Sequence, residues 1–144
     1  MENMATLHIS TDKDALDLPL IYQFLSERST WAIGIPLPVV ERAIANSLCF
    51  GAYLDGRQVG FARVTTDYAT FAYLADVFVV EDARGKGHSK RLVEAVLAHP
   101  DLRGLRRFML ATSDAHELYA RYGFTPPARL ATLMERYVPN IYAN

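Results

Sequence analysis

The spacing of apolar residues predicts a strand and two helices near the start of the chain. Segment 7–10, LHIS, is typical of a short first strand. Apolar residues then recur over 16–25 at the spacing of one helix face, and an aspartate just before them favours a helix start. The two prolines and the glycine of 34–38 indicate a loop, and 39–45 is predicted as a second, short helix.

From residue 48 onward the pattern changes to that of strands. Segments 48–54 and 58–67 flank the pair Asp55-Gly56, and two apolar strands around such a pair predict a β-hairpin. Segment 69–80 is almost entirely apolar, which is typical of a strand that is covered on both faces.

The rest of the chain alternates helices and strands. A helix is predicted over 89–99 and is ended by Pro100, a strand over 106–112, a helix over 114–122 and a last strand over 133–138. This order predicts an α/β (mixed α+β) fold in which helices flank a central mixed sheet.

Composition narrows the class of protein. The chain has 144 residues, 51% of them hydrophobic, with no repeat or linker, so we expect one domain over 1–144. The single Cys49 excludes a disulfide scaffold and is expected in the core, and a net charge of −1 is unlike that of a nucleic-acid binder. The scattered histidines predict no metal site. No apolar run approaches the roughly 20 residues that span a bilayer, and segment 1–17 lacks the pattern of a secretory signal, so a cytoplasmic enzyme or binding domain is expected.

The candidate chemistry lies in segment 76–97, where a buried strand, a glycine turn and a helix follow one another. Free backbone N–H groups and the helix dipole make such a turn suitable for a phosphate, and Arg84, Lys86 and Lys90 add positive charge. The Walker pattern is absent. A dinucleotide fold is disfavoured because Lys90 stands at the third glycine position and the strand follows a hairpin.

Two motifs in this order resemble the GNAT superfamily of acyl-CoA-dependent N-acetyltransferases. The turn Arg84-Gly85-Lys86-Gly87-His88-Ser89 fits the pattern [QR]-x-x-G-x-[GA] except at Ser89, where Gly or Ala is usual, and LYARYGF at 118–124 is similar to the family's L-Y-x-x-x-G-F. Thr112 is a second departure, because many members carry Asn there. The resemblance implies a mixed, mostly antiparallel sheet of six or seven strands with about four helices. It also implies acetyl-CoA as cosubstrate and the primary amine of an unidentified acceptor. A homodimer is left open, and the alternative function is a non-catalytic CoA-binding sensor or interaction module.

The resemblance also implies roles for single residues. Tyr119 is expected to protonate the departing thiolate, although a plain core aromatic would fit its helix too. Asp76, the one charge in an apolar strand, is expected to be the general base or the anchor of the acceptor amine, or else a structural hydrogen-bond acceptor. Strand alternation would turn Tyr73 and Asp76 to opposite faces unless a bulge intervenes. Asp114 is expected to cap the Tyr119 helix.

The remaining expected site residues fall into two groups. The acceptor side is expected to include Trp31, Tyr73 and His116. The expected cofactor-binding residues are Phe78, Val79, Arg84, Gly85, Lys86, Gly87, His88, Ser89, Lys90 and Thr112, with Phe78 and Val79 acting through their backbone. His88 is expected to be exposed, with a side chain of little importance.

Overall fold

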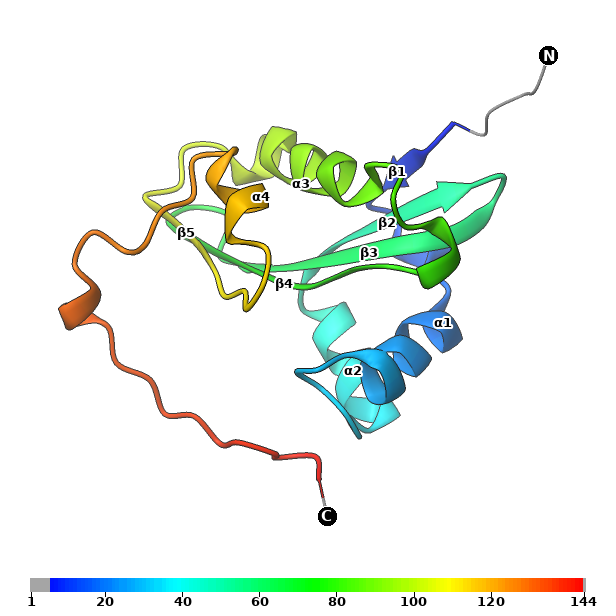
Figure 1. Cartoon of the computed structure of the whole chain (residues 1–144), viewed down its shortest axis with the longest axis horizontal. Helices are drawn as coiled ribbons and strands as arrows, with labels where there is room; N and C mark the ends of the chain where they lie inside the picture. Colours follow the sequence, from blue (N-terminus) through cyan, green and yellow to red (C-terminus); the bar gives the residue numbers. More distant parts are fainter. Residues whose placement is uncertain (1–5, 144) are drawn as a thin grey trace.

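A computed structural model describes residues 6–143 and shows one sheet between two layers of helices (Figure 1). Residues 1–5 and 144 lie outside the described part. Residues 1–5 are part of the segment 1–17, in which no secretory signal is expected, so this expectation lies partly outside the described residues. The two ends of the expected domain over 1–144 lie outside them as well.

The sheet has five strands, which lie in the order in which they occur along the chain. They are β1 (His8–Ser10), β2 (Leu48–Leu54), β3 (Arg57–Thr66), β4 (Phe71–Val79) and β5 (Arg107–Leu110). Every neighbouring pair is antiparallel except β4 and β5, which are parallel. The mixed, mostly antiparallel sheet is confirmed, with fewer strands than the six or seven expected.

The strand predicted over 133–138 is not formed within the described residues. This segment follows a single turn at Leu130–Thr132 and has no regular hydrogen-bonded structure. A strand satisfies its backbone groups only beside another strand, and none of the described strands pairs with this segment. The prediction is therefore wrong for this chain as the structure describes it.

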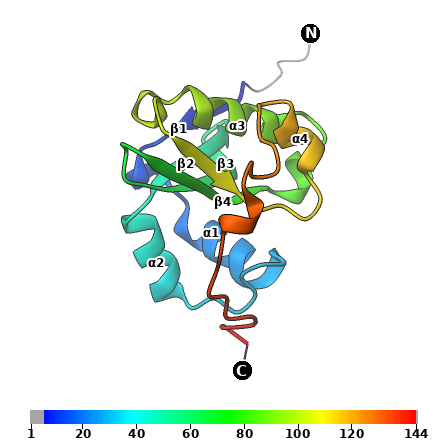
Figure 2. The same ribbon diagram turned by 90° about the vertical axis from the view of Figure 1, so that its left-hand side faces the viewer.

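Four α-helices cover the two faces of the sheet. They are α1 (Leu18–Gln23), α2 (Leu37–Ala45), α3 (His88–Ala98) and α4 (His116–Ala120). Helices α3 and α4 lie on one face, and α1 and α2 on the other (Figures 1 and 2). Helix α2 begins two residues earlier than predicted because Pro38 falls in its first turn, where a missing N–H costs no helical hydrogen bond. No helix within 6–143 is long and apolar enough to cross a membrane.

Each helical layer has its own apolar core. On the α3 face, Leu92, Val93 and Val96 are fully buried against the sheet. A Cβ at Gly60 would lie 3.0 Å from Leu92 Cδ1, so the helix packs directly on the backbone of β3. On the α1 and α2 face, the rings of Phe24 and Phe78 stack with their centroids 3.9 Å apart.

A bulge interrupts β4 at Asp76. Between the pairs Phe61–Phe78 and Arg63–Ala75, one residue of β3 faces two residues of β4, and Asp76, one of these two, has a φ of 56°. The extra residue turns Asp76 to the face that carries Arg63 and Ala75. Tyr73 lies on this face as well, because its partner Thr65 is two residues from Arg63. Tyr73 and Asp76 therefore share a face, as expected only if a bulge intervenes.

The packing of α3 makes a stability prediction. Leu92→Ala should lower the free energy of unfolding by about 2–5 kcal/mol, because it leaves a cavity in a site that is fully buried. Glu94→Ala on the exposed side of the same helix should change it by no more than about 0.5 kcal/mol. Urea unfolding followed by circular dichroism measures both, and equal effects of the two substitutions would contradict this packing.

Candidate functional site

The site begins where β4 and β5 separate. The last pair between them is Leu74 with Leu110, whereas β4 continues to Val79. The N–H of Val80 donates to the carbonyl of Val59 at 2.8 Å, so this position points toward β3. Because backbone groups alternate in direction along an antiparallel strand, the N–H groups of Val77 and Val79 point the other way, into the opening.

Phe78 and Val79 have their side chains in the two cores. Phe78 packs in the core of the α1 and α2 face, and Val79 in that of the α3 face. The carbonyl of Val79 accepts a hydrogen bond from Arg84 Nε at 2.9 Å, which ties the following turn to the end of the strand. Only the backbone of these two residues is available to a ligand, and by alternation the N–H of Val79 faces the opening.

The turn between β4 and α3 has the geometry and the charge that suit an anion. Gly85 and Gly87 have φ of 81° and 78°, a conformation that favours glycine. Gly87 is the N-cap of α3 and supplies no side-chain acceptor, so the first N–H groups of the helix are left for a ligand. Lys86 and Lys90 are exposed and form no ion pair within residues 6–143.

His88 and Ser89 open helix α3 and are half-buried. The Nε2 atom of His88 is buried and has no hydrogen-bond partner in the described part of the chain. The expectation of an exposed His88 is therefore wrong. A buried polar atom without a partner is unfavourable, so this nitrogen fits a turn whose partner is a ligand.

Thr112 organises the start of helix α4. Its hydroxyl accepts hydrogen bonds from the N–H of Ala115 at 3.0 Å and of Asp114 at 3.4 Å. The N-cap position is Ala115, and the Asp114 side chain caps no N–H of this helix within the described residues, so the predicted cap is wrong. The side-chain acceptor at this turn is instead Thr112, three residues before the N-cap position.

Tyr119 is 8% exposed and stands edge-on to Phe124, with ring centroids 5.9 Å apart. Burial raises the pKa of its phenol, and the nearby Asp114 carboxylate raises it further. The hydroxyl forms no hydrogen bond with another described residue. The ring lines a groove of about 940 Å³ beside β5, together with Thr112 and His116.

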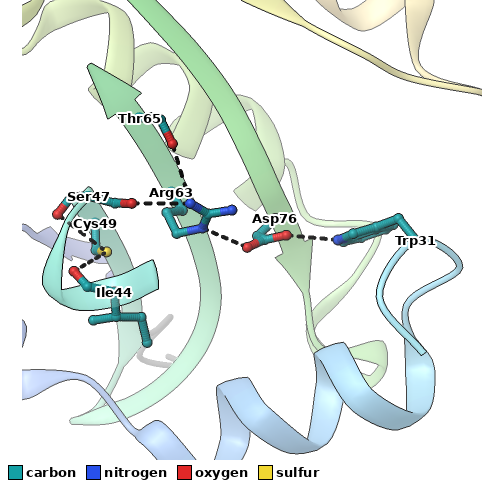
Figure 3. Close-up of polar contacts among 7 residues, drawn as sticks. All are labelled: Trp31, Ile44, Ser47, Cys49, Arg63, Thr65 and Asp76. Atoms are coloured by element: carbon teal, nitrogen blue, oxygen red, sulfur yellow. Dashed lines mark hydrogen bonds and ion pairs between the residues drawn. The ribbon is translucent and has the colours of Figure 1, made fainter. Parts of the chain in front are cut away.

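On the opposite face, Asp76 joins three segments of the chain (Figure 3). Its Oδ2 accepts a hydrogen bond from Arg63 Nε at 2.8 Å, and its Oδ1 accepts one from Trp31 Nε1 at 2.8 Å. Arg63 also donates to the hydroxyls of Ser47 at 3.1 Å and Thr65 at 3.3 Å. The side chains of Arg63 and Asp76 are only 20% and 11% exposed, so the ion pair is well shielded from water.

This ion pair forms the polar end of a smaller cavity of about 200 Å³. Trp31, Arg63 and Asp76 line it together with apolar residues of α2, of β3 and of the segment between α1 and α2, and with Tyr142 near the C-terminus. Its walls leave room for a small, largely apolar group next to a carboxylate and a guanidinium.

The expected site residues therefore form two groups on opposite faces of the sheet. Asp76, Trp31 and Tyr73 are on the α1 and α2 face, and Tyr119, Thr112 and His116 are on the α4 face. His116 is exposed and lies with Tyr119, not with Trp31. The two cavities described above have no lining residue in common.

Arg63 is the main site residue that the sequence interpretation missed. It is the one charge inside the apolar run of β3, the same signal that singled out Asp76 in β4. A lone charge of opposite sign in each of two apolar strands predicts a buried ion pair if the two strands are neighbours in the sheet, as β3 and β4 are. Ser47 and Thr65, which complete its hydrogen bonds, carry no comparable signal.

Cys49 lies in the core, as predicted. It is 1% exposed, and burial raises the pKa of its thiol to about 11, so the group stays protonated and unreactive at neutral pH. Among residues 6–143, no group of three or more histidine, cysteine or acidic side chains could hold a metal ion.

Fold and site together define a mixed α/β protein in which the pairing of β4 and β5 ends early and a glycine turn leaves the first N–H groups of α3 free. Residues 18–124 match the acetyltransferase (GNAT) family, and the chain belongs to this family. The family match confirms the resemblance to the GNAT superfamily that the two sequence motifs indicated.

Three known proteins resemble this chain in sequence or in fold. A GNAT-family protein of Xanthomonas campestris pv. campestris, described as a candidate acetyltransferase, is 63% identical, covers 99% of this chain and 100% of its own, and superimposes with a TM-score of 0.95. A protein of Gibberella zeae, also named as a candidate acetyltransferase, is 30% identical and aligns over 78% of this chain and 75% of its own. A GNAT acetyltransferase of Brucella melitensis, crystallised in complex with acetyl-CoA, is 20% identical with a TM-score of 0.65 over 85% of this chain and 84% of its own.

The ion pair predicts the effect of removing one charge. Asp76→Asn keeps the size of the side chain but leaves the shielded Arg63 guanidinium without a carboxylate, so the free energy of unfolding should fall by about 1.5–3 kcal/mol. Trp31→Phe removes one donor and keeps the ion pair, so it should cost no more than about 1.5 kcal/mol.

Chemical denaturation measures both effects. Because Trp31 is the only tryptophan, its fluorescence also reports directly on the contact with Asp76 and should change in Asp76→Asn. An Asn variant with wild-type stability and unchanged emission would contradict the role of this ion pair.

Proposed function

We propose that this protein transfers an acetyl group from acetyl-CoA to the primary amine of an acceptor. The observation that carries the proposal is the end of pairing between β4 and β5, which is followed by the glycine turn at the start of α3. Tyr119 is buried in the same core as Val79 at the end of β4. Membership of the GNAT family supports the proposal, as does the acetyl-CoA complex of the Brucella relative.

The residues of the turn suit the pyrophosphate of CoA. The free N–H groups at the start of α3 offer hydrogen bonds, and Arg84, Lys86 and Lys90 offer positive charge. The unpartnered Nε2 of His88 supplies a further polar atom there. The N–H groups of Val77 and Val79 suit the amide groups of the pantetheine arm, which would lie along the unpaired edge of β4.

Acetyl-CoA supplies an activated acyl group, and the chain supplies hydrogen bonds and a proton. An N–H on the unpaired edge of β4 would stabilise the negative charge that develops on the acyl oxygen when the neutral amine attacks. As the C–N bond forms and the C–S bond breaks, Tyr119 would donate its phenolic proton to the departing thiolate, and the proton that the amine nitrogen loses would restore the phenol. The raised pKa of Tyr119 supports this role, because the phenol stays protonated at neutral pH and its proton is available.

The acceptor would approach from the α1 and α2 face, on the other side of the opening. The cavity of about 200 Å³ at Asp76 favours an amine attached to a compact apolar group. The lone pairs of Asp76 that Arg63 and Trp31 leave free would accept an N–H of that amine and hold it toward the opening. Tyr73, half-exposed on the same face, would border the entrance.

Turnover of acetyl-CoA over a panel of primary amines tests the proposal. Release of CoA can be followed with a thiol reagent with little background, because the single cysteine is buried and protonated. Amine-dependent release is expected. CoA binding without release for any amine would favour the binding-module alternative, and no CoA binding at all would overturn both.

The proton donor makes a kinetic prediction. Tyr119→Phe removes one oxygen from a ring that stays packed on Phe124, so kcat should fall roughly 10- to 1,000-fold while the Kd for CoA stays unchanged. The wild-type rate should decline only above the ordinary tyrosine range, where the phenol of raised pKa loses its proton.

Tyr122→Phe, one turn further along the chain and half-buried, is the matched control and should keep the wild-type kcat. A Tyr119→Phe variant with unchanged kcat and weakened CoA binding would show that Tyr119 is a binding residue instead.

The anion-binding turn makes a prediction about affinity. Gly87→Trp should prevent a pyrophosphate from approaching the free N–H groups of α3, and the affinity for CoA should fall by more than about tenfold. The control is Gly104→Trp, in the loop before β5, because Gly104 is exposed like Gly87 and has a similar φ of 75°. This variant carries the same backbone strain and should bind CoA as the wild type does. Calorimetric titration decides, and equal affinities of the two variants would rule out this turn as the binding site.

A further inference from the structure

The outer edge of the sheet at β5 is unpaired. Within the described residues β5 pairs only with β4, so the N–H and carbonyl groups on its other side have no strand partner. An open edge of this kind is a template for another strand, and proteins generally cover or charge it. The groove of about 940 Å³ lies along this edge and is lined by Phe108, Met109 and Leu110.

The chain also carries a segment that lacks a partner of its own. Residues 133–138 have the apolar pattern of a strand, yet Met134 is 97%, Tyr137 73% and Val138 60% exposed. Such a run of large apolar side chains in water is uncommon in a folded chain unless something covers it. The segment leads from the β5 end of the sheet toward the α1 and α2 layer instead of lying along β5 (Figures 1 and 2).

The far end of this segment is attached to the body of the protein. Tyr142 is packed against the core of the α1 and α2 face, and a Cβ at Gly34 would lie 2.8 Å from the Tyr142 carbonyl oxygen. The other end is held by Leu133, which lines the groove beside β5. Residues 134–138 are thus stretched between two attachments with their apolar side chains exposed.

We infer that two copies of this chain exchange these segments, so that residues 133–138 of each form a strand on the β5 edge of the other. A second copy is the partner that brings both a free edge and a free segment, and a two-fold axis would satisfy both sets at once. The charges agree with this pairing. Arg106 and Arg107 at the start of β5 form no ion pair within residues 6–143, and Glu135 in the segment forms none either.

Exchange would also complete the groove beside Tyr119. The strand from the second copy would cover the open side of this groove and bury apolar side chains of both chains. The inference rests on the edge and the segment, not on the proposed acetyl transfer, and its readout is a molecular mass. Its failure and that of the proposed function are therefore distinguishable.

Sedimentation of the full chain at about 100 µM tests the inference, because association follows mass action. The wild-type protein should sediment as a dimer. Glu135→Pro and Arg136→Pro each remove one backbone N–H donor. Neighbouring N–H groups of a strand point to opposite sides, so one of the two variants should lose a hydrogen bond to β5. That variant should be monomeric, while Glu135→Ala and Arg136→Ala, which keep their N–H groups, should remain dimeric.

Amide hydrogen exchange of residues 107–110 gives a second readout. Exchange should be slow in the wild-type dimer and fast in the monomeric proline variant, whose helices should be intact by circular dichroism because 133–138 lies outside both cores. A wild-type protein that is monomeric at this concentration would overturn the inference. A dimer that persists in both proline variants would overturn it as well, since the interface would then lie elsewhere.

Discussion

The separation of β4 from β5 is the constraint on which the rest of the site depends. If β4 and β5 stayed paired to the end of β4, the backbone groups of β4 that face β5 would all be used in that pairing. Here the pairing ends at Leu74, and two residues later a bulge with Asp76 in a left-handed conformation bends β4 away. The edge beyond it keeps its N–H groups for a ligand, and the turn that follows leads directly into the N-terminus of α3.

The bulge is held in place by side chains, which explains why it carries a charge in an apolar strand. Asp76 is anchored to β3 by Arg63 and to the loop after α1 by Trp31. A non-glycine residue in the left-handed region is strained, and such strain persists where the surroundings determine the conformation. The ion pair thus connects the shape of the opening with the cavity on the α1 and α2 face, and a change in either partner should affect both.

Much of the fold could be predicted from the sequence because it follows from local pattern. The hairpin at Asp55-Gly56, the apolar strand β4 and the amphipathic helix α3 each repeat one period over many residues. The glycine turn was equally accessible, since its function depends on residue types at adjacent positions. Arg63 as the partner of Asp76 depends on the pairing of β3 with β4, which local pattern does not supply.

The failures have a common physical cause. A strand over 133–138 needs a neighbour, and periodicity says nothing about whether one is present. The turn before α4 is held by Thr112, whose hydroxyl accepts from the N–H groups of Asp114 and Ala115, and the Asp114 side chain does not cap the helix because the path of the chain after β5, and not the residue type, decides which oxygen is in reach. The half-buried His88 likewise depends on how the turn folds back on the sheet.

The central claim is that the opening between β4 and β5 and the turn at α3 form one binding site for acetyl-CoA. Its most direct test is the change in backbone amide chemical shifts when acetyl-CoA is added to the ¹⁵N-labelled protein. The account predicts changes concentrated at Val77–Val79, through the turn 84–90 and around Tyr119, with smaller changes at Trp31. Changes confined to the α1 and α2 face, or none along the edge of β4, would contradict it.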